Sequence, residues 1–89
     1  MQAIVGVDPH KRVFSAVAID ARGGQLGKWT GGTTSQAIRE LRVWASAHAP
    51  GAVWAIESTN SWGRRLAVAL GEAGADVRAG TERQMPVGL

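Results

Sequence analysis

Two carboxylates, Asp8 and Glu57, each follow directly on a short apolar run and are the side chains best placed to do chemistry. The runs, Ala3 to Val7 and Ala52 to Ile56, are too short for helices, and they predict strands buried on both faces at the centre of a sheet. Because an ionised group is costly to bury without partners, each carboxylate is expected at a sheet edge that faces solvent, a metal ion or a hydrogen-bond donor. Asp8 has a second interpretation as a turn residue, since Asp before Pro often opens a turn.

The rest of the pattern predicts an α/β fold. In chain order we expect strands at residues 3–8, 13–20 and 25–30, a helix ending near Pro50, a strand at 52–56, a helix ending at Gly74 and a strand at 75–79. The first helix is capped by Thr33, Thr34 or Ser35, and the second by a residue within 58–61. Right-handed crossovers from the three-stranded meander place the fourth strand beside the first and parallel to it, in the mixed five-stranded order 3-2-1-4-5.

Parallel neighbours end on the same side of a sheet, which brings Asp8 and Glu57 side by side where open α/β sheets bind their ligands. Two carboxylates about 4 Å apart repel by roughly 4 kcal/mol at an effective dielectric constant of about 20. Such a pair tends to share a proton or to hold a cation. The chain has no cysteine, and hard oxygen ligands favour Mg²⁺ or Mn²⁺.

The same connections leave one face of the sheet without helices. Both crossovers run in the same direction, so both helices are expected on one face, although the central strands are apolar. A large exposed apolar patch promotes association. We therefore expect self-association through the uncovered sheet face.

The composition describes one small domain. The chain has 89 residues, with ten basic and seven acidic side chains and a formal net charge of +3, which permits a polyanionic partner such as a nucleic acid. We expect the domain to span residues 1–79, followed by a polar, irregular tail at 80–89. The sequence shows neither a signal peptide nor an apolar run long enough to span a bilayer, so a soluble cytoplasmic protein without a membrane partner is expected.

Two short motifs around the carboxylates carry a family resemblance. Gly6-x-Asp8-x-His10-Lys11 is followed some fifty residues on by Glu57-x-Thr59-x-x-Trp62-Gly63. This pair resembles the N-terminal part of the DEDD transposases of bacterial insertion sequences of the IS110 type. The resemblance implies a ribonuclease H-like domain similar to RuvC resolvases, in which four acidic residues bind two Mg²⁺ ions for DNA strand cleavage and transfer. It assigns Asp8 and Glu57 to the first and second acidic positions, with DNA as partner and a guide RNA as a further one.

The chain departs from this family at its C-terminal end. The family continues past the fifth strand to a D-x-x-D element that supplies its third and fourth carboxylates, whereas no aspartate here follows Asp76. Asp76, Glu82 or a second subunit would have to replace them. With two of the four carboxylates, we expect a truncated or degenerate N-terminal piece that binds Mg²⁺ or Mn²⁺ weakly and is inactive as an enzyme on its own.

Basic residues accompany the carboxylates in the sequence. His10, Lys11 and Arg12 follow Asp8, and Arg64 and Arg65 follow Glu57 by a few positions, so they are candidates for contacts with a nucleic-acid backbone. The alternative is a solvated turn and an exposed helix surface. Of the four tryptophans, three fall on helical apolar stripes or inside a buried strand and are expected in the core rather than stacked on bases, namely Trp44, Trp54 and Trp62.

Two other functions fit parts of the same sequence. Actin-like ATPases and sugar kinases also begin with a strand, an aspartate and a hairpin, and Gly6 and Asp8 suit such a nucleotide-binding fragment. Their phosphate loop needs glycine and hydroxyl residues after the aspartate, whereas this chain has Pro9, which lacks a backbone N–H, and the bulky His10 and Lys11. The second alternative is a small non-enzymatic nucleic-acid-binding module, in which neither carboxylate matters.

Overall fold

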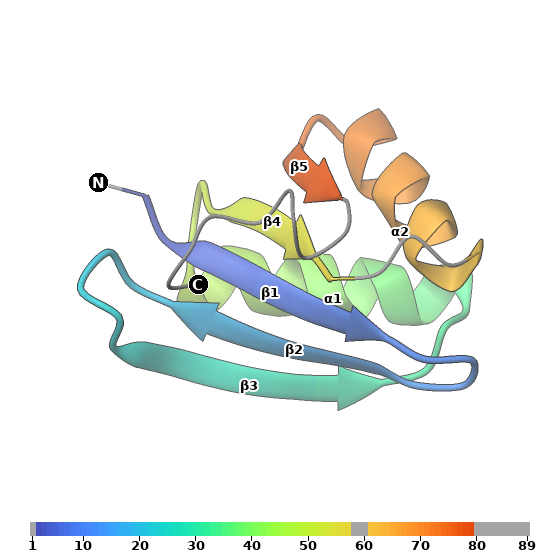
Figure 1. The fold of residues 1–89 in the computed structure, drawn as a ribbon, viewed down its shortest axis with the longest axis horizontal. Helices are drawn as coiled ribbons and strands as arrows, with labels where there is room; N and C mark the ends of the chain where they lie inside the picture. The colour runs from blue at the N-terminus through green and yellow to red at the C-terminus, as the bar shows by residue number, and fades with distance from the viewer. Residues whose placement is uncertain (1, 58–60, 80–89) are drawn as a thin grey trace.

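The computed structural model describes residues 2–57 and 61–79, and this part of the chain folds into five strands and two helices (Figure 1). The strands are β1 (Ile4–Pro9), β2 (Phe14–Ile19), β3 (Gln25–Gly31), β4 (Val53–Ile56) and β5 (Asp76–Ala79), and the helices are α1 (Ser35–His48) and α2 (Ser61–Glu72). The helix-cap candidates at 58–60 and the expected tail at 80–89 lie outside the described residues.

The strands form a mixed sheet in the predicted order, β3-β2-β1-β4-β5. β1, β2 and β3 pair antiparallel as a meander, and β4 runs parallel to both β1 and β5. Asp8 pairs with Ser15, and Pro9 is buried and pairs with Phe14, so both belong to β1. The interpretation of Asp8 as a turn residue is therefore wrong, because the hairpin begins only at His10.

Thr34, one of the three predicted cap residues, caps the start of helix α1. Oγ1 of Thr34 accepts a hydrogen bond of 3.1 Å from the backbone N–H of Ala37, which satisfies one of the free N–H groups of the first turn. The helix ends at His48, directly before Ala49 and Pro50. Proline disfavours helical backbone in the residue before it, so the predicted end of this helix is confirmed.

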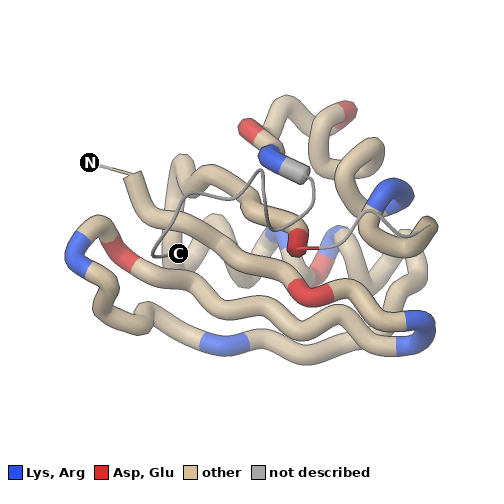
Figure 2. Tube along the Cα trace, viewed as in Figure 1, with Lys and Arg blue, Asp and Glu red and all other residues tan. Residues whose placement is uncertain are grey.

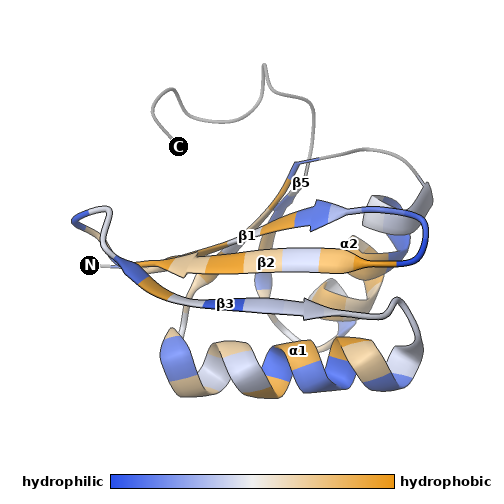
Figure 3. Ribbon diagram, turned by 90° about the horizontal axis from the view of Figure 1, so that it is seen from below, coloured by the Kyte–Doolittle hydropathy of each residue, from blue (hydrophilic) through white to orange (hydrophobic). Residues whose placement is uncertain are grey.

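Both helices contribute to one hydrophobic core on one face of the sheet. Ile38, Leu41 and Ala45 of α1 and Leu66 and Leu70 of α2 pack in the same cluster as the buried strand side chains. In an edge-on view the sheet lies above α1 (Figure 3). The buried strand residues of this cluster are Val5, Val7, Phe14, Ala16, Ala18, Trp54 and Ile56.

The opposite face of the central strand is only partly covered. Along β1, burial alternates: Val5, Val7 and Pro9 are buried, whereas Ile4, Gly6 and Asp8 are partly exposed. The expectation that β1 is buried on both faces is therefore wrong, because both described helices pack on the same side. In β4, consecutive residues Trp54 and Ala55 are both buried, so that strand does have little exposure on either face. No helix within the described ranges is long and apolar enough to cross a membrane.

Candidate metal and nucleic-acid site

Asp8 and Glu57 occupy adjacent positions at the carboxyl ends of β1 and β4. The parallel register aligns Val7 with Ile56, both of which face the core. Glu57 then donates its backbone N–H to the carbonyl oxygen of Val7 over 3.1 Å, which continues the pairing beyond β4. Since side chains alternate along a strand, Asp8 and Glu57 both turn to the face opposite the helices. Figure 2 shows the acidic ends of the two strands next to each other.

The surroundings of the two carboxylates leave them hydrated. The Asp8 side chain is 50% exposed, and Glu57 is exposed. A cation can reach both groups from solvent without crossing the core. The pair is therefore suited to binding an ion from solution.

The donor set fits a single hydrated Mg²⁺ or Mn²⁺ ion. Both ligand groups are hard carboxylate oxygens, and these ions prefer oxygen ligands and keep several waters. Within residues 2–57 and 61–79, no group of three or more His, Cys, Asp or Glu side chains could hold a metal ion. Because a two-metal site needs ligands that bridge and hold both ions, the described residues do not provide one.

The register of β5 excludes Asp76 as a replacement carboxylate. Asp76 aligns with Val53, which aligns with Ile4 at the start of β1. Asp8 lies four residues farther along β1, which corresponds to roughly 13 Å of extended chain. Asp76 is therefore at the wrong end of the sheet, and its carboxylate lies 3.9 Å from Arg78 instead. Glu82, the other proposed replacement, lies outside the described residues.

Basic side chains lie at the same end of the sheet as the carboxylate pair. Lys11 and Arg12 are exposed in the hairpin between β1 and β2, and Arg64 and Arg65 are exposed near the start of α2. Figure 2 shows these basic segments on either side of the acidic strand ends. The arrangement offers two positively charged positions to a polyanion that crosses the ends of β1 and β4.

His10 behaves differently from its basic neighbours. Its Nε2 atom lies 3.0 Å from Oδ2 of Asp8, with the imidazole side chain 64% exposed. The sequence pattern groups His10 with the nucleic-acid contacts and does not indicate its pairing with Asp8. The spacing in the sequence could have indicated this pair. Asp8 and His10 are two residues apart, and side chains two residues apart in an extended chain point to the same face.

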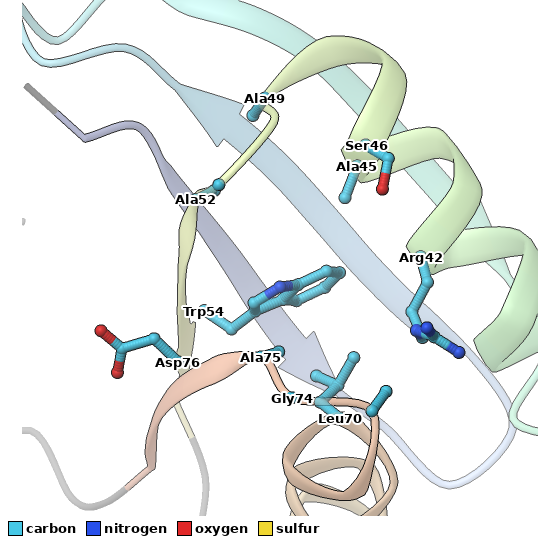
Figure 4. A pocket seen from close by; sticks show the side chains of 12 residues that line it. Arg42, Ala45, Ser46, Ala49, Ala52, Trp54, Leu70, Gly74, Ala75 and Asp76 are labelled. Carbon is cyan, nitrogen blue, oxygen red and sulfur yellow. The ribbon is translucent and has the colours of Figure 1, made fainter.

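The tryptophans expected in the core pack there. Trp54 is buried, and Trp44 and Trp62 pack against the core from the helices. Trp54 lies between α1 and α2 at a groove of about 330 Å³ (Figure 4). Trp54 faces the helix side of β4 whereas Asp8 and Glu57 face the other side, so this groove is separate from the carboxylate pair.

Comparison with known families gives one match that spans most of the chain. A family model described as a transposase, of the DEDD type found in IS110 elements, matches residues 5–86. Apart from Ile4, the first residue of β1, the matched region contains all the strands and helices of the described residues, together with both carboxylates. It continues past β5 to residue 86. No curated protein matches the chain.

Solved structures of RuvC share the fold. The structure of Thermus thermophilus RuvC in complex with a Holliday junction substrate is 16% identical, with a TM-score of 0.66, and the match covers 93% of this chain and 66% of the RuvC chain. A second Thermus thermophilus RuvC structure is 20% identical, with a TM-score of 0.59, and the match covers 89% and 63%. The chain thus spans just under two thirds of the length of these proteins. The likeness identifies a ribonuclease H-like α/β fold of the RuvC kind.

Proposed function

Because this chain belongs to the IS110-type DEDD transposase family, we propose that it takes part in DNA transposition, with Asp8 and Glu57 as the first two carboxylates of the family's metal site. The observation that carries this proposal is the placement of both side chains on one face at the carboxyl ends of adjacent parallel strands. Residues forty-nine positions apart in the sequence meet there, at the edge where open α/β sheets bind ligands.

The two carboxylates would hold one Mg²⁺ or Mn²⁺ ion weakly. When bound, such an ion stabilises the negative charge that develops on a phosphate oxygen during strand cleavage. Asp8 and Glu57 contribute by keeping two hydrated, negatively charged ligands next to each other. We infer that the chain alone does not cleave DNA, since two-metal hydrolysis needs more ligands than these two.

DNA would cross the carboxylate pair between the two basic positions. Lys11 and Arg12 lie in the hairpin on one side and Arg64 and Arg65 on the helix on the other. Each lysine or arginine that neutralises a phosphate releases a counterion, so binding through these residues weakens as salt increases. A guide RNA carries the same backbone charge, and it is a second candidate for this surface.

A binding experiment with matched charge changes tests the nucleic-acid part. We expect Lys11→Glu with Arg12→Glu, or Arg64→Glu with Arg65→Glu, to weaken binding of branched DNA at least tenfold and to reduce its salt dependence. Arg22→Glu with Lys28→Glu is the control with the same change in charge, because Arg22 lies in the β2–β3 turn at the opposite end of the sheet and Lys28 is exposed on the edge strand β3. Equal losses of DNA affinity in all three variants would mean that only the overall charge of the chain matters. That result would contradict the proposed path of the DNA. The affinity for RNA of matched length, measured in the same assay, shows which of the two nucleic acids the chain binds more tightly.

A metal titration tests the carboxylate part. Mn²⁺ should bind the chain with a dissociation constant on the order of 1 mM or weaker, because only two protein ligands are preorganised. Asp8→Asn and Glu57→Gln should each abolish this binding. Mn²⁺ binding that survives both changes would refute the site. A nuclease assay with Mg²⁺ or Mn²⁺ on branched and linear DNA should show no cleavage, and cleavage that disappears in Asp8→Asn would refute inactivity of the isolated chain.

We also infer that the uncovered sheet face, which is the face that the described helices leave open, mediates self-association. The half-buried apolar residues on the face opposite the described helices are Ile4, Val17, Ile19 and Val53. Their side chains gain free energy when they are removed from water, by roughly 25 cal/mol for each Å² of apolar surface. Packing of two such faces against each other is the simplest way for an isolated chain to achieve this.

A further inference from the structure

The contact between His10 and Asp8 is built into the end of β1. Pro9 lies between them, fully buried and paired with Phe14, which fixes the backbone on both sides. On the far side, the backbone N–H of His10 donates a hydrogen bond of 2.9 Å to the carbonyl oxygen of Val13 and closes the hairpin. The imidazole is thus carried by an anchored residue, and its Nε2 reaches Oδ2 of Asp8 at 3.0 Å.

This hydrogen bond constrains one oxygen of the carboxylate and leaves the other available. An exposed aspartate samples several rotamers, and it loses that freedom when a metal ion binds. A donor that holds one carboxylate oxygen in the metal-free state lowers the entropy lost at binding, and outer hydrogen bonds orient metal ligands in this way in many proteins. Oδ2 accepts the bond from Nε2, so Oδ1 is the oxygen left for an ion.

We propose that His10 is a positioning residue that holds Asp8 in the orientation needed for metal binding. The inference rests on the proposed function of Asp8 and names a role that the carboxylates cannot supply themselves. It replaces the expectation that His10 contacts a phosphate, because its polar Nε2 already faces Asp8. Lys11 and Arg12, which are exposed in the same hairpin, remain the residues for backbone contact.

Two amides separate this role from the alternatives. In His10→Gln the side-chain nitrogen falls at the position of the imidazole Nε2 and still donates to Asp8. In His10→Asn the amide is one bond shorter and corresponds to Nδ1, so it does not reach. His10→Ala removes every polar atom. Positioning by the hydrogen bond therefore predicts that the Gln variant behaves like wild type, whereas the Asn and Ala variants share one defect.

The first measurement needs no metal ion. Three-bond couplings of Asp8 in the isotope-labelled 89-residue chain report whether its χ1 angle occupies one rotamer or averages over several. We expect one dominant rotamer in wild type and in His10→Gln, and averaging in His10→Asn and His10→Ala. Averaging already in wild type, or no difference between wild type and His10→Ala, would overturn the positioning role.

The second measurement is titration of the same four proteins with Mn²⁺ alone. We expect His10→Asn and His10→Ala to weaken Mn²⁺ binding by about three- to tenfold, below the 10- to 100-fold typical of outer-shell partners because this pair is exposed. His10→Gln should stay within about twofold of wild type. Equal weakening in all three variants would make the imidazole itself a metal ligand, and tighter binding would make it a competitor, and either result overturns the inference.

Failure of this inference is distinguishable from failure of the proposed function. An ordered Asp8 whose substitution by Asn leaves Mn²⁺ binding unchanged would refute the metal site. In that case the imidazole would position a carboxylate that binds no metal, and the inference as stated would fall with it. If Mn²⁺ binding depends on Asp8 while the χ1 angle of Asp8 averages over several rotamers in wild type, only the role of His10 is refuted.

Discussion

The backbone N–H of Glu57 donates to the carbonyl oxygen of Val7 over 3.1 Å, one residue beyond the last paired residue of β4. This bond keeps the parallel alignment intact up to the point where both strands carry a carboxylate. Two negative charges are thereby held as direct neighbours on the same face, with no basic side chain supplied by either strand.

Removal of one of these charges should stabilise the metal-free chain. We expect Glu57→Gln to raise the melting temperature at low ionic strength, because it removes the repulsion between the two carboxylates. The rise should be only about 2 °C, since the repulsion between exposed charges is weak and screened. The gain should disappear in 1 M NaCl, where the Debye length is about 3 Å. Thermal unfolding at both salt concentrations measures the effect. Glu40→Gln, a change of the same charge at an exposed position in the interior of α1, is the control and should leave the melting temperature unchanged. A lower melting temperature for Glu57→Gln would contradict the predicted repulsion.

A glycine in β3, Gly27, lies close against two side chains of α1. A Cβ atom on Gly27 would lie 3.1 Å from Cδ2 of His48 and 3.4 Å from Cζ2 of Trp44, two rings that stack with centroids 5.2 Å apart. Gly27→Ala should therefore lower the free energy of unfolding by about 1 to 2 kcal/mol. Urea denaturation measures the change.

Gly6 in β1 provides the matched control for this prediction. A Cβ atom there would meet no atom within 4 Å. Gly6→Ala should leave stability unchanged or raise it by about 0.5 kcal/mol, since alanine reduces the freedom of the unfolded chain. Similar losses for the two variants would contradict the assignment of the Gly27→Ala loss to contact with α1.

The choice of helix cap gives a third test. Thr34→Ala should cost about 1 kcal/mol of stability, because the N–H of Ala37 loses its acceptor. Thr33→Ala should cost less, since no cap bond depends on it in the described structure. Chemical denaturation of both variants compares the two threonines directly. A larger loss from the Thr33 change would contradict the observed cap.

The uncovered sheet face gives a fourth test. Val17→Lys places a charge among the half-buried apolar side chains opposite the helices, and we expect it to shift the chain toward monomer at high micromolar concentration. Val68→Lys is the control, because Val68 is 55% exposed on α2, away from that face. Sedimentation equilibrium reports the change. A wild-type chain that is already monomeric at this concentration would rule out self-association through the face.

Patterns in the sequence alone predict the order of strands and helices and the two positions where chemistry is expected. Short apolar runs, glycines and a proline encode local structure directly, and a carboxylate at the end of an apolar run is visible without any coordinates. The rule for crossover handedness then sufficed for the sheet order and for the approach of Asp8 and Glu57.

The tertiary structure decided what depends on pairing between distant segments. Only the register of β5 shows that Asp76 lies at the opposite end of the sheet from Asp8. With both described helices on one side, alternate residues of β1 are partly exposed, although its residues alone are typical of a fully buried strand. Gly27 owes its importance to two rings on α1. The physical reason is that burial, register and contact belong to pairs of segments, whereas the sequence pattern describes each segment separately.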